Sequence, residues 1–237
     1  MKDEGMDEVL NNAARGSGDM KPETLARIAA SIQPSMRRVR PLPPAWMMAA
    51  GLVLICAAVA FAGAARAGFL GFAKMDLAQR FLIFPVLAAL AWAAGTGFVK
   101  EMTPASLRRM SAGAQLGFSI AVLLSLFALL FRDGQTDHFV SLGVVCLATG
   151  FLHAIPAGLL CWLTARRGFA FNPVTAGLAA GLLGGLAGVG VLELHCPNFE
   201  AAHILVWHTA VVPVSGVAGA LVGWIVRRRE RPIEPVA

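Results

Sequence analysis

The sequence predicts an all-α protein, a polytopic membrane bundle of six transmembrane helices preceded by a short N-terminal cytoplasmic segment. Six long apolar runs fill most of the chain after residue 45, and none has a Lys, Arg, Asp or Glu in its interior. Each approaches the ~17–25 residues that a helix needs to cross a hydrocarbon core about 30 Å thick. Unpaired backbone polar groups are not tolerated in lipid, so the runs are expected to be helices. They are Trp46–Gly63, Phe81–Val99, Ala112–Phe131, Phe139–Leu163, Val174–Leu192 and His203–Val226.

The basic residues predict the orientation of the bundle. Sixteen of the 20 Lys and Arg residues fall in the N-terminal segment, the second and fourth loops and the tail. Short loops rich in Lys and Arg remain in the cytoplasm, so both termini are expected there. This topology accounts for the isoelectric point near 9.8, and no direct nucleic-acid partner is needed to explain it. A cleavable signal peptide would require a short n-region, whereas about 45 polar residues precede the first run.

The segment before the first membrane helix is expected to form a separate unit, residues 1–45, followed by a membrane domain, 46–226, and a basic tail, 227–237. Within it, residues 22–33 can form a short helix that carries Leu25, Ile28 and Ile32 on one face. A helix of about 12 residues is marginal alone in water. Its apolar face is therefore expected to pack either on a partner protein or on the lipid surface.

Small residues recur at every fourth position in the fifth and sixth runs, at Gly177, Gly181, Gly184, Gly185, Gly188, Ser215, Gly219 and Gly223. Such spacing allows helices in a membrane to approach closely and pack by direct contact. A compact bundle is expected from this pattern.

The four cysteines differ in their predicted depth within the membrane. Cys56 and Cys161 are most simply small buried hydrophobic residues. Cys196 is expected to be accessible in an outer loop, and Cys146 to be recessed about two turns inside the fourth helix. The non-cytoplasmic compartment of a bacterium is oxidising, so these two could form a disulfide there. Spacing alone does not establish that they meet.

Histidines gather toward the same predicted face, and His195 with Cys196 could recruit a thiophilic metal. A haem between His153 and His208 is a further alternative, although it requires facing helices. The simpler interpretation is that the histidines pack or hydrogen-bond between helices. No cofactor is predicted.

Apart from histidine, the sequence predicts no ionisable residue inside the membrane. Transporters and channels usually place such residues on the substrate path. Phosphate-binding, zinc-protease and hydrolase motifs are also missing from the sequence, and the loops are short. An enzyme is therefore not expected, and a small transporter or channel remains the alternative to a regulatory protein.

The second half of the chain resembles the NrsF family, negative regulators of sigma F, in three stretches. These are Cys146 to Arg166-Arg167-Gly168, Asn172-Pro173 to Ala176-Gly177, and Leu194-His195-Cys196-Pro197 to Trp207. The resemblance implies a six-span anti-sigma factor of the bacterial inner membrane that binds an extracytoplasmic-function sigma factor. It also implies that Cys146 and Cys196 are a redox- or metal-responsive pair on the periplasmic side. The chain departs from the family pattern at Asn198, at Trp207-His208 and in having no Tyr.

Overall fold

The computed structural model describes residues 43–103, 110–131, 138–165 and 172–229, together with four single positions near the N-terminus. The chain divides into two compact units, residues 1–42 and 43–237. In the first unit the described positions Glu23, Ala26, Arg27 and Ala30 are helical and exposed. The predicted contact residues Leu25, Ile28 and Ile32 lie outside the described residues.

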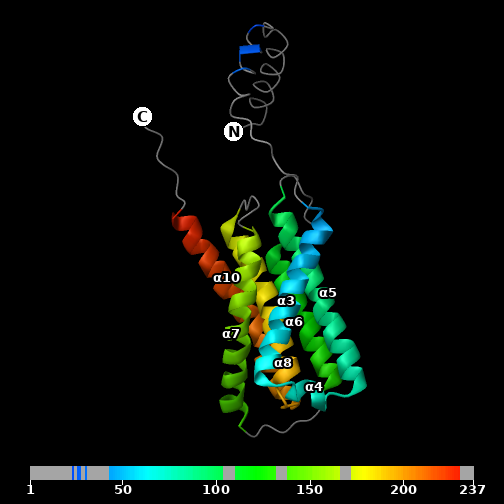
Figure 1. The fold of residues 1–237 in the computed structure, drawn as a ribbon. Helices are drawn as coiled ribbons and strands as arrows, with labels where there is room; N and C mark the ends of the chain where they lie inside the picture. The colour runs from blue at the N-terminus through cyan, green and yellow to red at the C-terminus, as the bar shows by residue number, and fades with distance from the viewer. Residues whose placement is uncertain are drawn as a thin grey trace, which may run out of the picture. The chain divides into compact units, whose positions relative to one another are not determined.

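The described part of the second unit is helical, without strands, and six of its helical segments are long and apolar enough to cross a membrane. The predicted fold class is confirmed. The first five spans are α3 (Ala45–Ala67), α5 (Leu77–Glu101), α6 (Ala112–Leu130), α7 (Phe139–Ala165) and α8 (Pro173–His195). The sixth combines α9 (Ala201–His203), the π-helical turn η3 (Ile204–His208) and α10 (Thr209–Arg229), and the short α4 (Leu70–Lys74) connects α3 to α5 (Figure 1).

Polar side chains fix the start of several spans. Asp76 and Gln79 form a reciprocal capping box at the beginning of α5, with Asp76 accepting from the Gln79 backbone N–H at 2.7 Å. Ser111 accepts from Ala114 N–H at the beginning of α6. These side chains satisfy N–H groups that have no partner within the helix, so each span begins where its cap lies.

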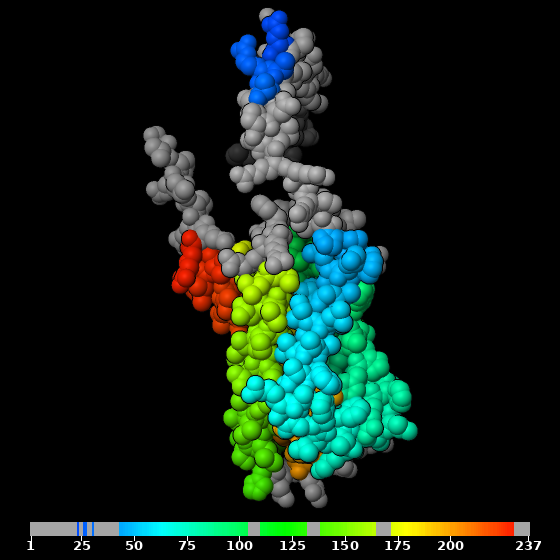
Figure 2. All heavy atoms as spheres, viewed as in Figure 1, coloured from blue at the N-terminus to red at the C-terminus, as the bar shows by residue number. Residues whose placement is uncertain are grey.

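The central helix of the bundle is α8. In its most hydrophobic 18-residue window 83% of the residues are buried, against 17% for α6. A Cβ at Gly181 would collide with the Ser215 carbonyl of α10, and a Cβ at Gly184 would lie 2.5 Å from the Ala154 carbonyl of α7. The predicted close packing through small residues is therefore confirmed. In the space-filling view α3 and α7 cover most of α8 on the face shown (Figure 2).

The two ends of the bundle differ. The beginning of α3 and the end of α10 lie at one end, and α4 lies at the other, which we call the α4 end (Figure 1). The residues that join α8 to α9 also lie at the α4 end. Cys196, the residue that directly follows α8, lies at this end.

Candidate functional site

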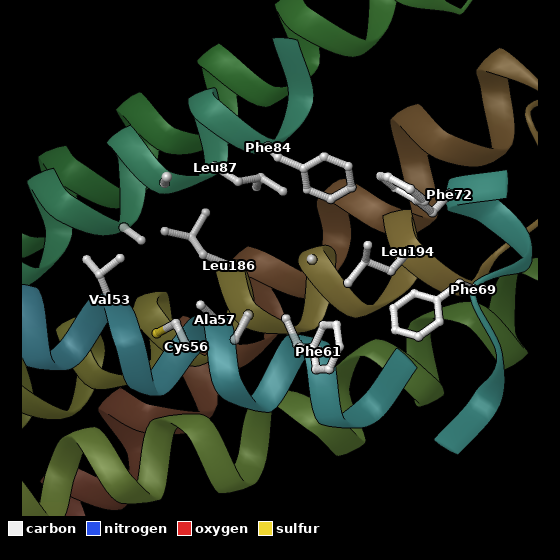
Figure 3. Close-up of a pocket in the computed structure, with 15 residues that line it drawn as sticks. Val53, Cys56, Ala57, Phe61, Phe69, Phe72, Phe84, Leu87, Leu186 and Leu194 are labelled. Carbon is white, nitrogen blue, oxygen red and sulfur yellow. The ribbon is translucent and has the colours of Figure 1, made fainter. Parts of the chain in front are cut away.

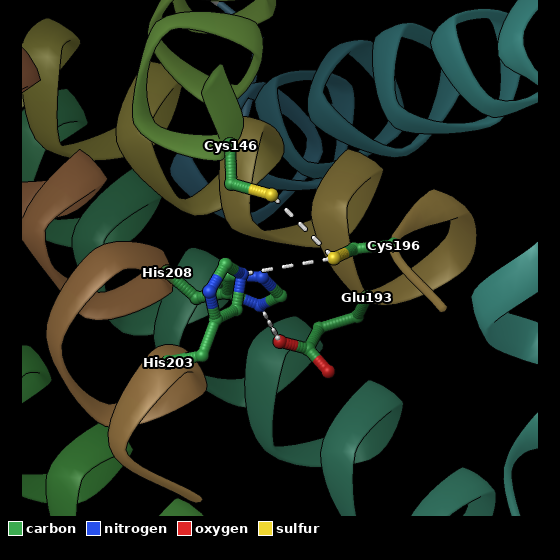
Figure 4. A network of polar contacts seen from close by, with 5 residues as sticks. All are labelled: Cys146, Glu193, Cys196, His203 and His208. Atoms are coloured by element: carbon green, nitrogen blue, oxygen red, sulfur yellow. Dashed lines mark hydrogen bonds and ion pairs between the residues drawn. The ribbon is translucent and has the colours of Figure 1, made fainter. Parts of the chain in front are cut away.

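The structure brings together the two cysteines that the sequence singled out. Cys146 Sγ, from the second turn of α7, lies 3.5 Å from Cys196 Sγ, from the residue that directly follows α8. Both are free thiols. Figure 4 shows their side chains pointing toward one another across the gap between the two helices. Residues 50 positions apart thus form one pair at the α4 end.

The position of Cys196 follows from the local sequence. Pro197 disfavours helical backbone at the preceding residue, and Cys196 is extended, with φ −70° and ψ 118°. Its backbone N–H still bonds to the Leu192 carbonyl at 2.7 Å, so it remains against the helix end. The α4 backbone packs closely there, because a Cβ on Gly71 would lie 2.6 Å from the Cys196 carbonyl.

This packing overturns one prediction. Cys196 was expected to be accessible and Cys146 recessed, but Cys196 is only 5% exposed and Cys146 is partly exposed. The cause is that α4 covers the end of α8, which holds Cys196 inside the bundle rather than on a free loop. The predicted accessibility of Cys196 is therefore wrong.

Two buried histidines complete the group with the cysteines. Cys196 Sγ lies 3.8 Å from His203 Nε2, and the His203 and His208 ring centroids are 5.3 Å apart. Among the described residues, Cys146, Cys196, His203 and His208 form a group whose potential ligand atoms all lie within 4.8 Å of one another. We call these four residues the Cys/His cluster.

A π-helical turn explains how the two histidines meet. In an α-helix of 3.6 residues per turn, residues five apart point in clearly different directions. The turn Ile204–His208 has π-helical geometry. Such a turn brings residues that are five positions apart onto the same side of the helix, and it is frequent at functional sites. Pro213, one turn later, cannot donate to the Thr209 carbonyl, so the sequence weakens the α-helix nearby. The sequence placed the histidines toward one face of the membrane, but no α-helical spacing joined His203 to His208.

A buried carboxylate lies beside the cluster. Glu193 is 1% exposed within α8, and its Oε1 accepts a hydrogen bond from His208 Nδ1 at 2.7 Å (Figure 4). The prediction that histidine is the sole ionisable residue type inside the spans is therefore wrong. The fifth apolar run appeared to end at Leu192, whereas α8 continues to His195 and carries Glu193 with it.

The surroundings favour a thiolate at Cys196. The hydrogen bond from the Cys146 thiol lowers the pKa of Cys196, burial opposes this by raising it, and the neighbouring His203 and His208 imidazoles lower it further. The net direction is downward. A thiolate is the nucleophilic and metal-binding form of cysteine.

The other predicted histidine ligands lie elsewhere. His195 Nδ1 is 3.0 Å from the Gly68 carbonyl, so this residue ties the end of α8 to the segment before α4 and is not part of the cluster. His153 Nδ1 is 2.9 Å from the Thr149 carbonyl, and its ring lies against Gly63 of α3. His208 faces Glu193 instead. The structure thus gives His153 and His208 separate partners, unlike a shared haem site.

A second thiol pair lies deeper in the bundle. Cys56 of α3 and Cys161 of α7 are neighbours, and both are buried, as predicted. The Cys56 thiol donates to the Leu183 carbonyl of α8 at 3.5 Å. Cys56 also lines an apolar cavity of about 510 Å³ between α3, α5 and α8, with Phe61, Phe72 and Phe84 toward one end (Figure 3). Such a lining suits hydrocarbon chains. Neither Cys56 nor Cys161 belongs to the Cys/His cluster.

Comparison with known proteins identifies the family. The model of the family described as NrsF, negative regulator of sigma F, matches residues 28–228, which include every span and the whole Cys/His cluster. No match was found among curated proteins. None was found among solved structures either. This family is regulatory rather than catalytic. The chain belongs to the NrsF family of negative regulators of sigma F.

Proposed function

We propose that this chain is an integral inner-membrane anti-sigma factor that sequesters an extracytoplasmic-function sigma factor through residues 1–45. It releases the sigma factor when a redox or metal signal reaches Cys146 and Cys196 from the periplasm. Membership of a family of sigma-factor regulators supports the partner. The observation that carries the sensing role is the 3.5 Å contact between the two thiols inside a cluster of buried ionisable groups.

The distribution of basic residues supports the orientation that this function requires. With residues 1–45 and the basic tail, 227–237, in the cytoplasm, the beginning of α3 and the end of α10 face the cytoplasm. The α4 end, with the Cys/His cluster, then faces the periplasm. Residues 46–226 form the membrane domain, which carries the sensor cysteines at its periplasmic end and connects them to the cytoplasmic segment.

Docking of the sigma factor is assigned to the apolar face of the N-terminal helix. Leu25, Ile28 and Ile32 recur at helical spacing, and an amphipathic helix that inserts its apolar face into a groove is a common mode of recognition. The exposed, helical Glu23 and Arg27 lie on other faces of the same segment. When the sigma factor is absent, the apolar face has the surface of the membrane as its alternative partner.

The relay to the cytoplasm is assigned to α7. This helix carries Cys146 near the α4 end and continues to Ala165, and it packs on α8 where Gly184 meets Ala154. A new bond at Cys146 changes how α7 is held against the end of α8. Such a change reaches the other end only if the bundle has two discrete arrangements with different affinities for the sigma factor.

The experiment that tests this function is co-purification of the sigma factor with the full-length protein. The double variant Leu25→Asp, Ile28→Asp is expected to lose the sigma factor, because burial of each side chain contributes ~1.5–3 kcal/mol. The matched control is Ala26→Asp, Ala30→Asp, which adds the same charges at exposed positions of the same segment. If the first variant retains the sigma factor as well as the control does, the docking assignment is wrong.

One observation favours the alternative, a small transporter or channel. Glu193 is an ionisable residue inside a span, and such residues often mark a substrate path. Here, however, Glu193 is paired with His208. Neither residue lines the apolar cavity between α3, α5 and α8 or a second apolar cavity between α7, α8 and α10. The alternative predicts a fully functional protein after deletion of residues 1–40. The anti-sigma function predicts that this deletion abolishes control of the sigma factor.

A further inference from the structure

We propose that Cys146, Cys196, His203 and His208 together bind one thiophilic divalent cation of the Zn²⁺ class, with Glu193 as the partner that orients His208. The inference rests on the proposed function, because it names the ligand of the same sensor site. To the two cysteines of that site the inference adds two histidine ligands, His203 and His208, and the carboxylate of Glu193, which the sequence did not group together.

The donor atoms have the spacing of a tetrahedral site. With Zn–S bonds of about 2.3 Å and Zn–N bonds of about 2.0–2.1 Å, neighbouring donors in a tetrahedron lie roughly 3.3–3.8 Å apart. The two sulfur atoms are 3.5 Å apart, and Cys196 Sγ is 3.8 Å from His203 Nε2. All four donors lie within 4.8 Å of one another. Small side-chain movements therefore suffice to close the site around a cation.

His208 is oriented as a metal ligand. Its Nδ1 donates to Glu193 Oε1 at 2.7 Å, which leaves the lone pair on Nε2. That Nε2 is buried beside the Cys196 thiol and makes no hydrogen bond of standard geometry within the described residues. A carboxylate that holds the outer nitrogen of a histidine is the usual second partner at metal sites, where it fixes the ring and its tautomer. A cation supplies the missing partner for His208 Nε2.

The charges also suit a divalent cation in a buried position. Two thiolates balance a dication, and two neutral imidazoles add no charge. The occupied Cys₂His₂ centre is therefore neutral, and the charge of the neighbouring Glu193 carboxylate is the one that remains, which limits the cost of burying the site in the bundle. Two soft sulfur and two imidazole donors select Zn²⁺-like cations over Mg²⁺ or Ca²⁺, which prefer oxygen.

The site joins three separate segments of the chain. Cys146 belongs to α7, Cys196 follows α8, and His203 and His208 belong to the sixth span. One cation would hold these segments together at the α4 end. Binding and loss of the cation thus act on the contact between α7 and α8 that the proposed relay uses.

The test uses the full-length protein in detergent, reduced and freed of metal with a chelator. Titration with Co²⁺ is expected to give intense d–d and thiolate-to-cobalt charge-transfer bands that saturate at one ion per chain and disappear when Zn²⁺ is added. Each of His203→Ala and His208→Ala is expected to weaken binding at least tenfold, and Glu193→Gln by roughly 10–100-fold. The matched control Cys56→Ser, Cys161→Ser alters the other thiol pair and is expected to bind as the wild type does.

X-ray absorption at the zinc edge of the wild-type protein gives a result that does not depend on the folding of a variant. Two sulfur and two nitrogen neighbours are expected. Any one of three results would overturn the inference. These are a site with sulfur neighbours but no histidine, an unchanged Co²⁺ affinity in both histidine variants, and the absence of stoichiometric binding. Co-purification of the sigma factor with the metal-free protein is measured in parallel. A retained sigma factor without metal binding rejects the metal site alone, whereas loss of the sigma factor in every metal state rejects the proposed function.

Discussion

Glu193 and His208 form a buried pair, with 2.7 Å between carboxylate and imidazole, and they join α8 to the sixth span at the α4 end. Both side chains are almost completely removed from solvent. A polar pair in such a position is costly to break, because each partner left alone remains desolvated. The pair therefore links the stability of the bundle to the geometry of the Cys/His cluster.

Substitution of Glu193 tests this link. Glu193→Leu leaves His208 Nδ1 without an acceptor and is expected to reduce the free energy of unfolding by about 1–3 kcal/mol. Glu193→Gln keeps an acceptor oxygen at the same place and is expected to lose clearly less stability than Glu193→Leu. Thermal unfolding of the two purified variants in one detergent provides the measurement. Equal loss in both variants would show that the charge, and not the hydrogen bond, holds the pair.

The contact between the cysteines predicts a specific cross-link. Treatment of isolated membranes with the oxidant diamide removes two electrons and two protons from the thiols and is expected to join Cys146 to Cys196. Peptide mapping by mass spectrometry under non-reducing conditions identifies the linked peptides. The link is expected in the Cys56→Ser, Cys161→Ser variant and absent from Cys146→Ser. Failure to find it in metal-free protein would contradict the observed proximity of 3.5 Å.

The packing of α8 on α10 makes a prediction about stability. Gly181→Leu places a large side chain where even a Cβ meets the Ser215 carbonyl, and it is expected to destabilise the bundle by about 1–3 kcal/mol or more. Gly117 of α6 has open space around its Cβ position, so Gly117→Leu is the matched control. A thermal shift of similar size in both variants would contradict the close approach of α8 and α10.

The orientation makes a prediction that fusion proteins can test. Alkaline phosphatase, which is active only outside the cytoplasm, is expected to be inactive when fused after residue 229 and active when inserted between residues 132 and 137. The first site follows α10, and the second lies between α6 and α7. The reverse pattern of activity would place the Cys/His cluster on the cytoplasmic side and contradict the proposed periplasmic signal.

Hydropathy was sufficient to predict the membrane architecture. Long apolar runs have few alternatives to spanning helices, so the six spans lie close to their predicted ranges. The Gly and Ser repeats predicted close packing of the fifth and sixth spans, because backbone contact requires small residues, but they did not assign the partner of each helix. Both features are local in the sequence, and each has a physical consequence that does not depend on the rest of the chain.

The composition of the cluster depends on features that are not local. Two of its members, His203 and His208, are aligned by a π-helical turn that has no simple sequence spacing. Glu193 appeared to lie beyond the fifth apolar run, and its burial depends on the way α9 and η3 fold back against α8. The burial of Cys196 depends on contact with α4, which comes from a segment more than 120 residues earlier. Such contacts become visible only when the helices are packed.

The most direct test of the account is induction of a reporter controlled by the sigma factor, in cells that carry variants of this chain. With the wild type and with Cys56→Ser, Cys161→Ser, exposure to a periplasmic oxidant or excess Zn²⁺ is expected to change reporter activity. With Cys146→Ser, Cys196→Ser, the sigma factor is still bound but the response to both stimuli is lost. A wild-type response from this double cysteine variant would contradict the claim that Cys146 and Cys196 receive the signal.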